Sequence, residues 1–282
     1  MRGATDRFAA TGIETARLDA ELLLSYVLEC PRMALYGKLD AALSSKQRDT
    51  FDALVQRRET HEPIAYILGE QEFWSLSFKV TADTLIPRPD TEALVEVGLK
   101  ALKGRKHPHI LDLGTGSGCI LLSLLHERPD GHGTGVEKSP EAMRVAMENA
   151  ERLRLPMASF RLGDWFQTVV APEFGYDLIV SNPPYIPSAD IAGLMPDVRN
   201  YEPMSALDGG EDGLTPYRIL TSKAPYFLND KGPNRESGTL AVEVGIHQAD
   251  DVAALFEASG FTGVMVTKDL GGIDRVVSGK KS

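Results

Sequence analysis

Apolar residues follow two different patterns along the chain, one before residue 71 and one after residue 108. Residues 1–70 place apolar side chains at near-helical spacing. A first helix is expected over Thr15–Glu29, and Ser44 or Ser45 can cap a second one. No acid–base pair or ligand cluster stands out in this region. We therefore expect a small helical domain that either recognises a substrate or has a packing role.

Short apolar runs alternate with helical stretches in the second part of the chain. Strands are expected at 109–113, 133–137, 158–162, 176–181, 238–243, 261–266 and 274–278, and helices at 118–127, 139–152, 213–228 and 247–258. The polar stretch 229–238 reads as a loop. Such alternation indicates a mostly parallel sheet covered on both faces. The linker 268–272 is too short for a helix, so the last two strands should be antiparallel.

These patterns divide the chain into three parts. We expect a helical substrate-recognition domain at 1–70, a β-hairpin linker at 71–84 with its turn at Ser75-Leu76, and an α/β domain at 85–282. Near the start of the last part, Arg88 lies between two prolines, which hold it as a fixed cation, and Asp90 or Thr91 can cap the next helix. A substrate-binding arginine and an ordinary surface arginine both fit this position.

Charge and cysteine usage narrow the class of protein. The 282 residues include 40 acidic and 30 basic ones, and a net charge of −10 argues against a nucleic-acid partner, which usually requires a basic surface. No apolar run has transmembrane length and the N-terminus lacks a signal-peptide core, so we expect a cytoplasmic protein without a membrane partner. Cys30 and Cys119 are far apart and the histidines lack metal-ligand spacing. We therefore expect reduced thiols and no metal site. We also expect a monomer.

A glycine-rich turn follows the first strand of the α/β part. The turn Gly114-Thr115-Gly116-Ser117-Gly118 leads into a helix, where glycines let a ligand approach the backbone and the helix N-terminus offers N–H groups. A P-loop would need Gly-Lys-Ser/Thr, and the dinucleotide fingerprint of nicotinamide oxidoreductases would need a glycine at Cys119. With Asp112 in front, the spacing instead looks like the S-adenosylmethionine loop of class I methyltransferases.

Acidic residues lie at the ends of the next two strands. Glu137 can accept hydrogen bonds from ribose hydroxyls, or it can simply be the acid that starts a helix. Asp164 is placed to accept a hydrogen bond from an adenine N6, and Trp165 offers a face for the ring. A tryptophan that only fills the core is the other interpretation.

The fourth strand ends in Asn182-Pro183-Pro184-Tyr185. Two prolines stop regular structure and keep the preceding residue extended, so Asn182 is held at the carboxyl end of a strand. Ligands bind at this end of open α/β sheets. The Asn182 amide, the Pro183 carbonyl and the Tyr185 ring would form a socket for a flat group that carries an NH2. A stiff surface turn is the alternative.

Taken in order, these features resemble the class I S-adenosylmethionine-dependent methyltransferases that act on amine or amide nitrogen. More narrowly, the chain resembles the release-factor glutamine N5-methyltransferase family (PrmC/HemK type). The most specific match is Pro87-Arg88-Pro89-Asp90-Thr91-Glu92. The other matching stretches are Glu62–Gly69, Phe73 with Phe78 and Val80, Asp112–Cys119, Asp164–Phe166, Asn182–Ile186 and Glu202–Leu214. Glu137 departs from the family, which more commonly has aspartate there.

The resemblance implies a Rossmann-like methyltransferase domain with S-adenosylmethionine as methyl donor and S-adenosylhomocysteine as product. The implied acceptor is the glutamine side-chain amide in the Gly-Gly-Gln motif of peptide chain release factors. The cofactor-binding residues implied or expected are Gly114, Thr115, Gly116, Ser117, Gly118, Glu137, Asp164, Trp165 and Asn182. The expected catalytic residues are Asn182, Pro183 and Tyr185, and Pro184 and Arg88 join them in substrate binding.

Two other functions stay open at this point. One is a nucleic-acid methyltransferase of adenine-N6 type, since similar Asn-Pro-Pro-Tyr turns serve exocyclic amines of flipped bases. The net charge, the small helical N-terminal domain and the loop at 87–92 argue against it. The other is a binding module that keeps the fold without turnover. The intact glycine turn, Glu137 and the Asn-Pro-Pro-Tyr stretch together argue against that reading.

Overall fold

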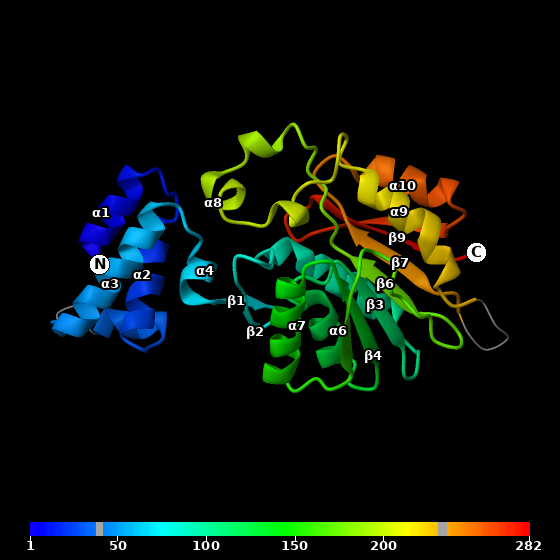
Figure 1. Ribbon diagram of the computed structural model, residues 1–282, viewed down its shortest axis with the longest axis horizontal. Helices are drawn as coiled ribbons and strands as arrows, with labels where there is room; N and C mark the ends of the chain where they lie inside the picture. Colours follow the sequence, from blue (N-terminus) through cyan, green and yellow to red (C-terminus); the bar gives the residue numbers. More distant parts are fainter. Residues whose placement is uncertain (38–41, 231–235) are drawn as a thin grey trace. The chain divides into compact units, whose positions relative to one another are not determined.

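The computed structural model describes residues 1–37, 42–230 and 236–282, so residues 231–235 of the predicted loop 229–238 lie outside the described part. The chain forms two compact units (Figure 1). One comprises Met1–Glu70 with Leu194–Tyr201, and the other comprises Gln71–Gly193 with Glu202–Ser282. In the described ranges, no helix is long and apolar enough to span a membrane.

The first unit is helical. It contains α1 (Arg2–Ala10), α2 (Ala16–Val27), η1 (Arg32–Gly37), α3 (Ser45–Glu59), α4 (Ile64–Leu68) and α8 (Pro196–Arg199). The predicted capping residue Ser44 forms a capping box, because its hydroxyl accepts from the Gln47 N–H and the Gln47 side chain accepts from the Ser44 N–H. A buried ion pair joins α3 to α2, with Arg58 Nε 2.8 Å from Asp19 Oδ2. Helix α1 was not singled out from the sequence.

The hairpin is formed by β1 (Glu70–Phe73) and β2 (Leu76–Lys79). Its turn is Trp74-Ser75, one residue earlier than predicted, and both residues have positive φ (54° and 57°). Two-residue hairpin turns with two positive φ angles normally use Gly, Asn or Asp, so the composition gave no sign of this register. A tertiary contact holds the turn, because the Trp74 N–H donates to Glu92 Oε1 at 2.9 Å.

Seven strands of the described chain form one sheet in the order β5-β4-β3-β6-β7-β9-β8. They are β3 (His109–Leu113), β4 (His132–Glu137), β5 (Ala158–Leu162), β6 (Leu178–Ser181), β7 (Thr239–Glu243), β8 (Thr262–Lys268) and β9 (Asp274–Lys280). Neighbouring strands from β5 to β7 are parallel, and β9 is antiparallel to both β7 and β8. The predicted α/β class with an antiparallel last strand is confirmed.

Helices cover both faces of this sheet (Figure 1). The helices are α5 (Glu92–Ala101), α6 (Cys119–Glu127), α7 (Pro140–Arg152), α9 (Thr215–Lys223) and α10 (Ala249–Ala258), with short 3-10 turns η2 (Pro89–Thr91), η3 (Ile191–Gly193), η4 (Met204–Ala206) and η5 (Ala224–Tyr226). Strand side chains alternate between faces. Leu178 and Val180 therefore belong to a core cluster with α5 and α6, and Ile179 belongs to one with α9 and α10.

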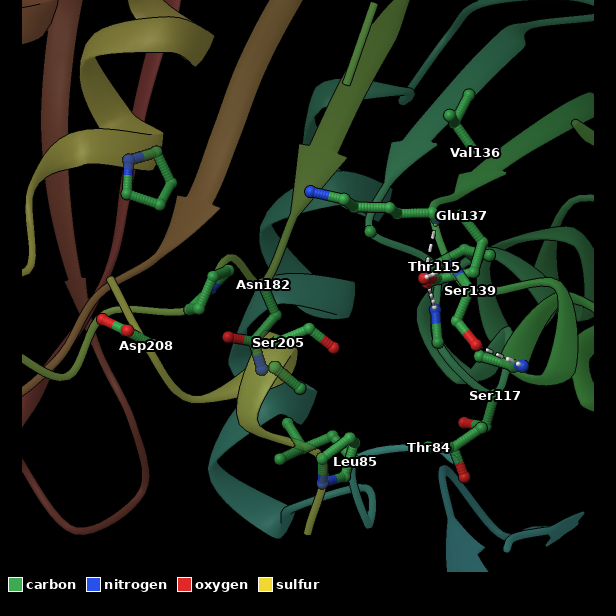
Figure 2. A pocket seen from close by; sticks show the side chains of 18 of the residues that line it. Thr84, Leu85, Thr115, Ser117, Val136, Glu137, Ser139, Asn182, Ser205 and Asp208 are labelled. Atoms are coloured by element: carbon green, nitrogen blue, oxygen red, sulfur yellow. Dashed lines mark hydrogen bonds between the residues drawn. The ribbon is translucent and has the colours of Figure 1, made fainter. Parts of the chain in front are cut away.

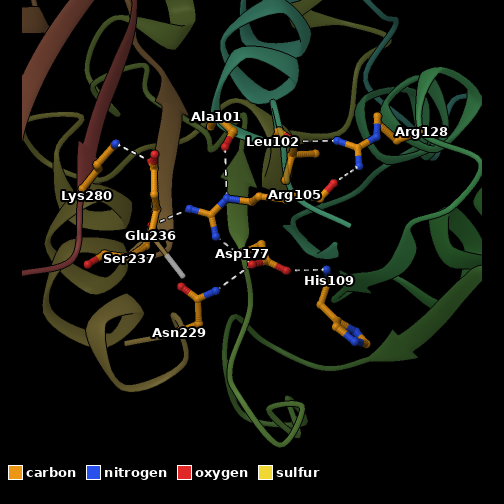
Figure 3. Close-up of polar contacts among 10 residues, drawn as sticks. All are labelled: Ala101, Leu102, Arg105, His109, Arg128, Asp177, Asn229, Glu236, Ser237 and Lys280. Atoms are coloured by element: carbon orange, nitrogen blue, oxygen red, sulfur yellow. Dashed lines mark hydrogen bonds and ion pairs between the residues drawn. The ribbon is translucent and has the colours of Figure 1, made fainter. Parts of the chain in front are cut away.

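Polar contacts join the amino ends of β3 and β6 and the segment that precedes β7 (Figure 3). Asp177 accepts from the Arg105 guanidinium at 2.7 Å, from the His109 N–H at 2.9 Å and from the Asn229 amide at 2.6 Å. Arg105 also donates to the Ser237 carbonyl at 2.6 Å. This network stabilises the end of the sheet opposite to the carboxyl ends of the parallel strands.

Candidate functional site

The carboxyl ends of β3, β4, β5 and β6 surround a cavity of about 720 Å³. Its lining comes from the stretches 83–91, 114–120, 136–142, 163–165, 182–184 and 203–219. Figure 2 shows Thr115, Ser117, Glu137 and Ser139 on one side of the cavity, with Asn182, Ser205 and Asp208 on the other. The parallel strands therefore bring the predicted glycine turn and the predicted Asn-Pro-Pro-Tyr turn to one cavity.

The glycine turn presents open backbone to the cavity. Gly114 and Gly116 have positive φ (73° and 56°), and a Cβ on either would meet nothing within 4 Å. Thr115 and Ser117 also line the cavity. The structure does not place Gly118 there, since a Cβ on it would lie 3.1 Å from Leu122 Cδ1 and 3.3 Å from the Ala146 Cβ. Gly118 instead allows α6 and α7 to pack closely.

Glu137 lines the cavity and ties the glycine turn to the start of α7. Its carboxylate accepts from the Gly116 N–H at 2.9 Å, from the Lys138 N–H at 2.8 Å and from the Ser139 N–H at 2.9 Å. A carboxylate has about four acceptor sites, so one site is left for a further donor. The position fits both a contact with a ligand and a residue that starts a helix.

Beneath the glycine turn, Asp112 is fully buried. Its Oδ2 accepts from the Thr115 hydroxyl at 2.6 Å, and its Oδ1 has no hydrogen-bond partner among the described residues. Burial raises the pKa of Asp112 to about 7, against the Thr115 hydrogen bond, which lowers it. Burial also raises the pKa of the cavity-lining Cys119 thiol to about 12. Cys119 is therefore a protonated thiol at neutral pH and a poor nucleophile.

Asp164 and Trp165 follow β5 and line the cavity. The Asp164 side chain is 38% exposed, so it can accept a hydrogen bond from a ligand, and it lies 3.7 Å from Lys138 Nζ. Trp165 is partly buried against the core cluster of α9 and α10. The structure thus gives Trp165 both a cavity-lining face and a packing role.

Asn182 lines the cavity at the end of β6, and its amide is held by Thr91. Asn182 Nδ2 donates to Thr91 Oγ1 at 3.3 Å. Thr91 precedes α5 but makes no side-chain capping bond, and Asp90 lies inside η2. The predicted cap by Asp90 or Thr91 is therefore wrong. The hydroxyl serves a contact between distant segments, which local sequence does not reveal.

Other side chains of the loop 87–92 each bind a different part of the fold. Arg88 Nη2 donates to Glu202 Oε1 at 2.5 Å, and Arg275 Nη2 donates to Asp90 Oδ2 at 3.1 Å. Glu92 contacts the hairpin turn and Thr91 contacts Asn182. Together with Arg88 and Asp90, four side chains of this loop therefore attach it to the rest of the fold. Arg88 lines the cavity, and its guanidinium is paired with Glu202 rather than isolated.

The structure does not place Pro183 or Tyr185 among the described residues that line the cavity, whereas Pro184 does line it. Pro183 is buried. Tyr185 packs against the core cluster of α9 and α10, where Gly245 leaves room for its ring, and burial raises the pKa of Tyr185. Because Gly245 has no side chain, the Tyr185 ring can pack into the core, where it supports the turn from the side opposite to the cavity.

Sequence reasoning missed the wall formed by residues 203–219. The wall is held to the Asn-Pro-Pro-Tyr turn by two backbone bonds, from the Ile186 N–H to the Leu207 carbonyl at 3.1 Å and from the Gly209 N–H to the Ile186 carbonyl at 2.9 Å. Part of this wall lay in a stretch that matched the family, but no role was assigned to it. In the part of the chain that the structure describes, no group of three or more His, Cys, Asp or Glu side chains could hold a metal ion.

Comparisons with known proteins match both the helical and the α/β part of the chain. A family model for the PrmC N-terminal domain matches residues 1–69, and a model for the methyltransferase small domain matches residues 91–193. The chain also resembles a solved methyltransferase from Pyrococcus furiosus, with 18% identity and a TM-score of 0.50 over 82% of this chain and 98% of that one. At this identity, the structural similarity shows the fold alone.

Two curated relatives are similar over nearly the whole chain. A release factor glutamine methyltransferase from Rhodospirillum rubrum is 47% identical over 281 residues, which cover 99% of this chain and 83% of the relative. One from Geobacter sulfurreducens is 46% identical over 275 residues, which cover 96% of this chain and 92% of the relative. The chain therefore belongs to the family of release factor glutamine methyltransferases.

Proposed function

We propose that this chain transfers a methyl group from S-adenosylmethionine to the glutamine side-chain amide in the Gly-Gly-Gln motif of peptide chain release factors. The observation that carries the proposal is the position of Asn182. It lies at the end of β6 in the cavity that also receives the open glycine turn and Glu137. Family membership supplies the acceptor, and the cavity supplies a place for both reactants.

The residues of the cavity fit the cofactor. Gly114 and Gly116 leave the backbone open, and Glu137 keeps one acceptor site for a ribose hydroxyl. Asp164 can accept from the adenine amino group, beside the Trp165 ring. When bound, S-adenosylmethionine supplies a methyl group on a positively charged sulfur.

Asn182 then orients the acceptor. The nitrogen lone pair of an amide is delocalised into its carbonyl, so the amide is a weak nucleophile. Asn182 Oδ1 accepts one N–H of the glutamine amide. Pro183 is buried, but its carbonyl belongs to the same turn and accepts the other N–H, which favours positive charge developing on that nitrogen. Correct alignment of the two reactants can lower the activation free energy by up to about 7–11 kcal/mol in favourable cases. Tyr185 holds the turn from behind.

Positioning, rather than a strong base, suits this cavity. Of the described residues that line it, none is a histidine. Cys119 keeps its proton at neutral pH because burial raises its pKa to about 12. Lys138 lies next to Asp164, 3.7 Å from its carboxylate.

We assign recognition of the release factor to the helical region 1–70, because none of the described cavity-lining residues comes from it. A cross-linking experiment tests this assignment. Cross-linking of the protein to a release factor should join residues of this region to the factor, and cross-links confined to the α/β unit would contradict the assignment.

A labelling assay tests the reaction. Methyl-tritiated S-adenosylmethionine is offered with a release factor, with the Gln→Ala variant of its Gly-Gly-Gln motif, and with DNA or RNA. Label is expected only in the release factor that keeps the glutamine of its Gly-Gly-Gln motif. Label in nucleic acid but not in the release factor would favour the exocyclic-amine reaction and reject the proposal.

A further inference from the structure

Glu243 is a buried carboxylate that the reaction described so far does not use. It is the last residue of β7, its side chain is nearly inaccessible, with 2% relative exposure, and Oε2 has no hydrogen-bond partner among the described residues. A buried acid without full hydrogen bonding is costly. Because Glu243 lies next to the site, its unfavourable burial points to a role in the reaction.

The sheet register places Glu243 beside Asn182. Strands β6 and β7 are parallel, and their last paired residues are Ser181 and Val242, so Asn182 and Glu243 are the next residues of the two strands. Side chains at equivalent positions of neighbouring strands point to the same face. Thr91 lies on that side as well, since its hydroxyl contacts Asn182.

We propose that Glu243 is a positioning residue that fixes the direction of the Asn182 amide, acting directly and through the Thr91 hydroxyl. The ionised carboxylate accepts from the Asn182 NH2 and from the Thr91 O–H. Asn182 Oδ1 is thereby turned toward the methyl acceptor. This inference rests on the proposed function, in which Oδ1 accepts from the acceptor amide.

A hydroxyl alone cannot fix this direction. Thr91 can donate to an amide oxygen or accept from an amide nitrogen, so it is compatible with both orientations of Asn182. An ionised carboxylate only accepts hydrogen bonds. With Glu243 ionised, the NH2 of Asn182 faces inward; with Glu243 protonated, the acid can donate and the amide can turn.

The surroundings of Glu243 hold its ionisation near neutral pH. Burial raises its pKa to about 7, while the Thr91 hydroxyl, the Arg275 guanidinium and the Asn182 amide lower it and Asp90 raises it. Among the described residues, Tyr185, Tyr217 and Cys119 also interact with it electrostatically. The active, ionised form should therefore increase as pH rises through about 7.

The experiment compares wild type with Glu243→Gln, which keeps the shape but cannot ionise. The kcat and both KM values for methylation of a release factor are measured at several pH values, together with the thermal midpoint. At about pH 8 we expect kcat to fall by about 10- to 100-fold, with KM for S-adenosylmethionine within about twofold. The fall in kcat of wild type below about pH 7 should disappear, and the thermal midpoint at about pH 8 should rise.

Asp177→Asn is the matched control. It also replaces a carboxylate of low exposure, at the opposite end of the same sheet. It should lower the thermal midpoint and leave the pH profile of kcat unchanged. A second check combines Thr91→Val with Glu243→Gln: if Thr91 relays the effect, the double variant should be no slower than the slower single variant.

The outcomes separate the two proposals. Wild type that methylates the release factor while Glu243→Gln keeps the same kcat and pH profile would overturn only the role of Glu243. A loss of kcat that merely follows a lower thermal midpoint would do the same. Wild type that fails to methylate the release factor would reject the proposed function and, with it, this inference.

Discussion

Asn182 Nδ2 donates to Thr91 Oγ1 at 3.3 Å, which links the end of β6 to the start of α5 across 91 residues of sequence. The loop that carries Thr91 is itself fastened through Arg88, Asp90 and Glu92 to three other parts of the fold. The Asn182 amide is therefore held by the most specific motif of the sequence.

Replacement of Asn182 by alanine should slow the chemical step. The variant loses the oxygen that, in the proposed reaction, accepts from the glutamine amide. We expect kcat to fall by about 10²- to 10³-fold, as for other preorganised hydrogen bonds at reacting groups. Cofactor affinity, measured by calorimetry, should change less. The exposed residue Asn200 gives the control Asn200→Ala, and near-wild-type turnover of Asn182→Ala would reject the mechanism.

Glu137→Gln should mainly weaken cofactor binding. The carboxylate accepts three backbone N–H bonds, and an amide can only partly replace them. We expect the dissociation constant of S-adenosylmethionine to rise by about 10-fold or more, with kcat at saturation changing less. Glu141→Gln, an exposed acid on α7, is the comparison. An unchanged dissociation constant would show that Glu137 does not organise the glycine turn for binding.

Gly209→Ala should displace the cavity wall. A Cβ there would lie 2.8 Å from the Tyr185 Cα and 2.9 Å from the Pro184 carbonyl oxygen, and backbone atoms cannot simply rotate away. A loss of kcat/KM of about 10-fold or more is expected from such a shift near the reacting groups. Gly193→Ala is the control, because a Cβ at Gly193 meets nothing within 4 Å. Equal activity of both variants would contradict the prediction.

Asp112 should make the stability of the free protein depend on pH. Its folded-state pKa of about 7 lies above the ordinary value of 3.8, so the folded form binds the proton more tightly than the unfolded form does. The stabilisation is complete below about pH 4 and is lost as pH rises through about 7. Asp112→Asn cannot titrate, so its free energy of unfolding relative to wild type should increase between about pH 5 and pH 8, on the order of 1–3 kcal/mol.

Denaturant unfolding of Asp112→Asn and wild type at the two pH values provides the measurement. Because Glu243 titrates in both proteins, its contribution cancels in the difference. A constant difference between the two proteins at both pH values would show that Asp112 has the same pKa folded and unfolded.

Asp177→Ala should lower stability without affecting catalysis per folded molecule. The change removes one acceptor of the Arg105 guanidinium and the acceptor of the His109 N–H bond, at the end of the sheet away from the cavity. A cost of about 2–4 kcal/mol in the free energy of unfolding is expected. Asp251→Ala, at an exposed position of α10, should cost little. If kcat of Asp177→Ala fell at a temperature where the protein stays folded, the network would have a role beyond stability.

Several details could not be predicted from local sequence because distant segments decide them. The hairpin turn moved to Trp74-Ser75, where the side chain of Glu92 accepts from its backbone. Asp90 or Thr91 was expected to cap a helix, and Thr91 instead contacts Asn182. Tyr185 was expected to face the acceptor, but Gly245, sixty residues later in the chain, leaves a space in the core that its ring occupies.

The alternation of apolar runs was enough to predict the seven strands, their covered faces and the antiparallel end of the sheet, because burial imposes those periods on the sequence. The positions of the motifs after predicted parallel strands were enough to predict that the glycine turn and Asn182 lie at the same edge of the sheet, since the carboxyl ends of parallel strands meet there. Tertiary structure alone revealed that Glu243 lies beside Asn182 and that Glu202 pairs with Arg88. Such partners depend on register and packing between remote segments, which leave no period in the chain.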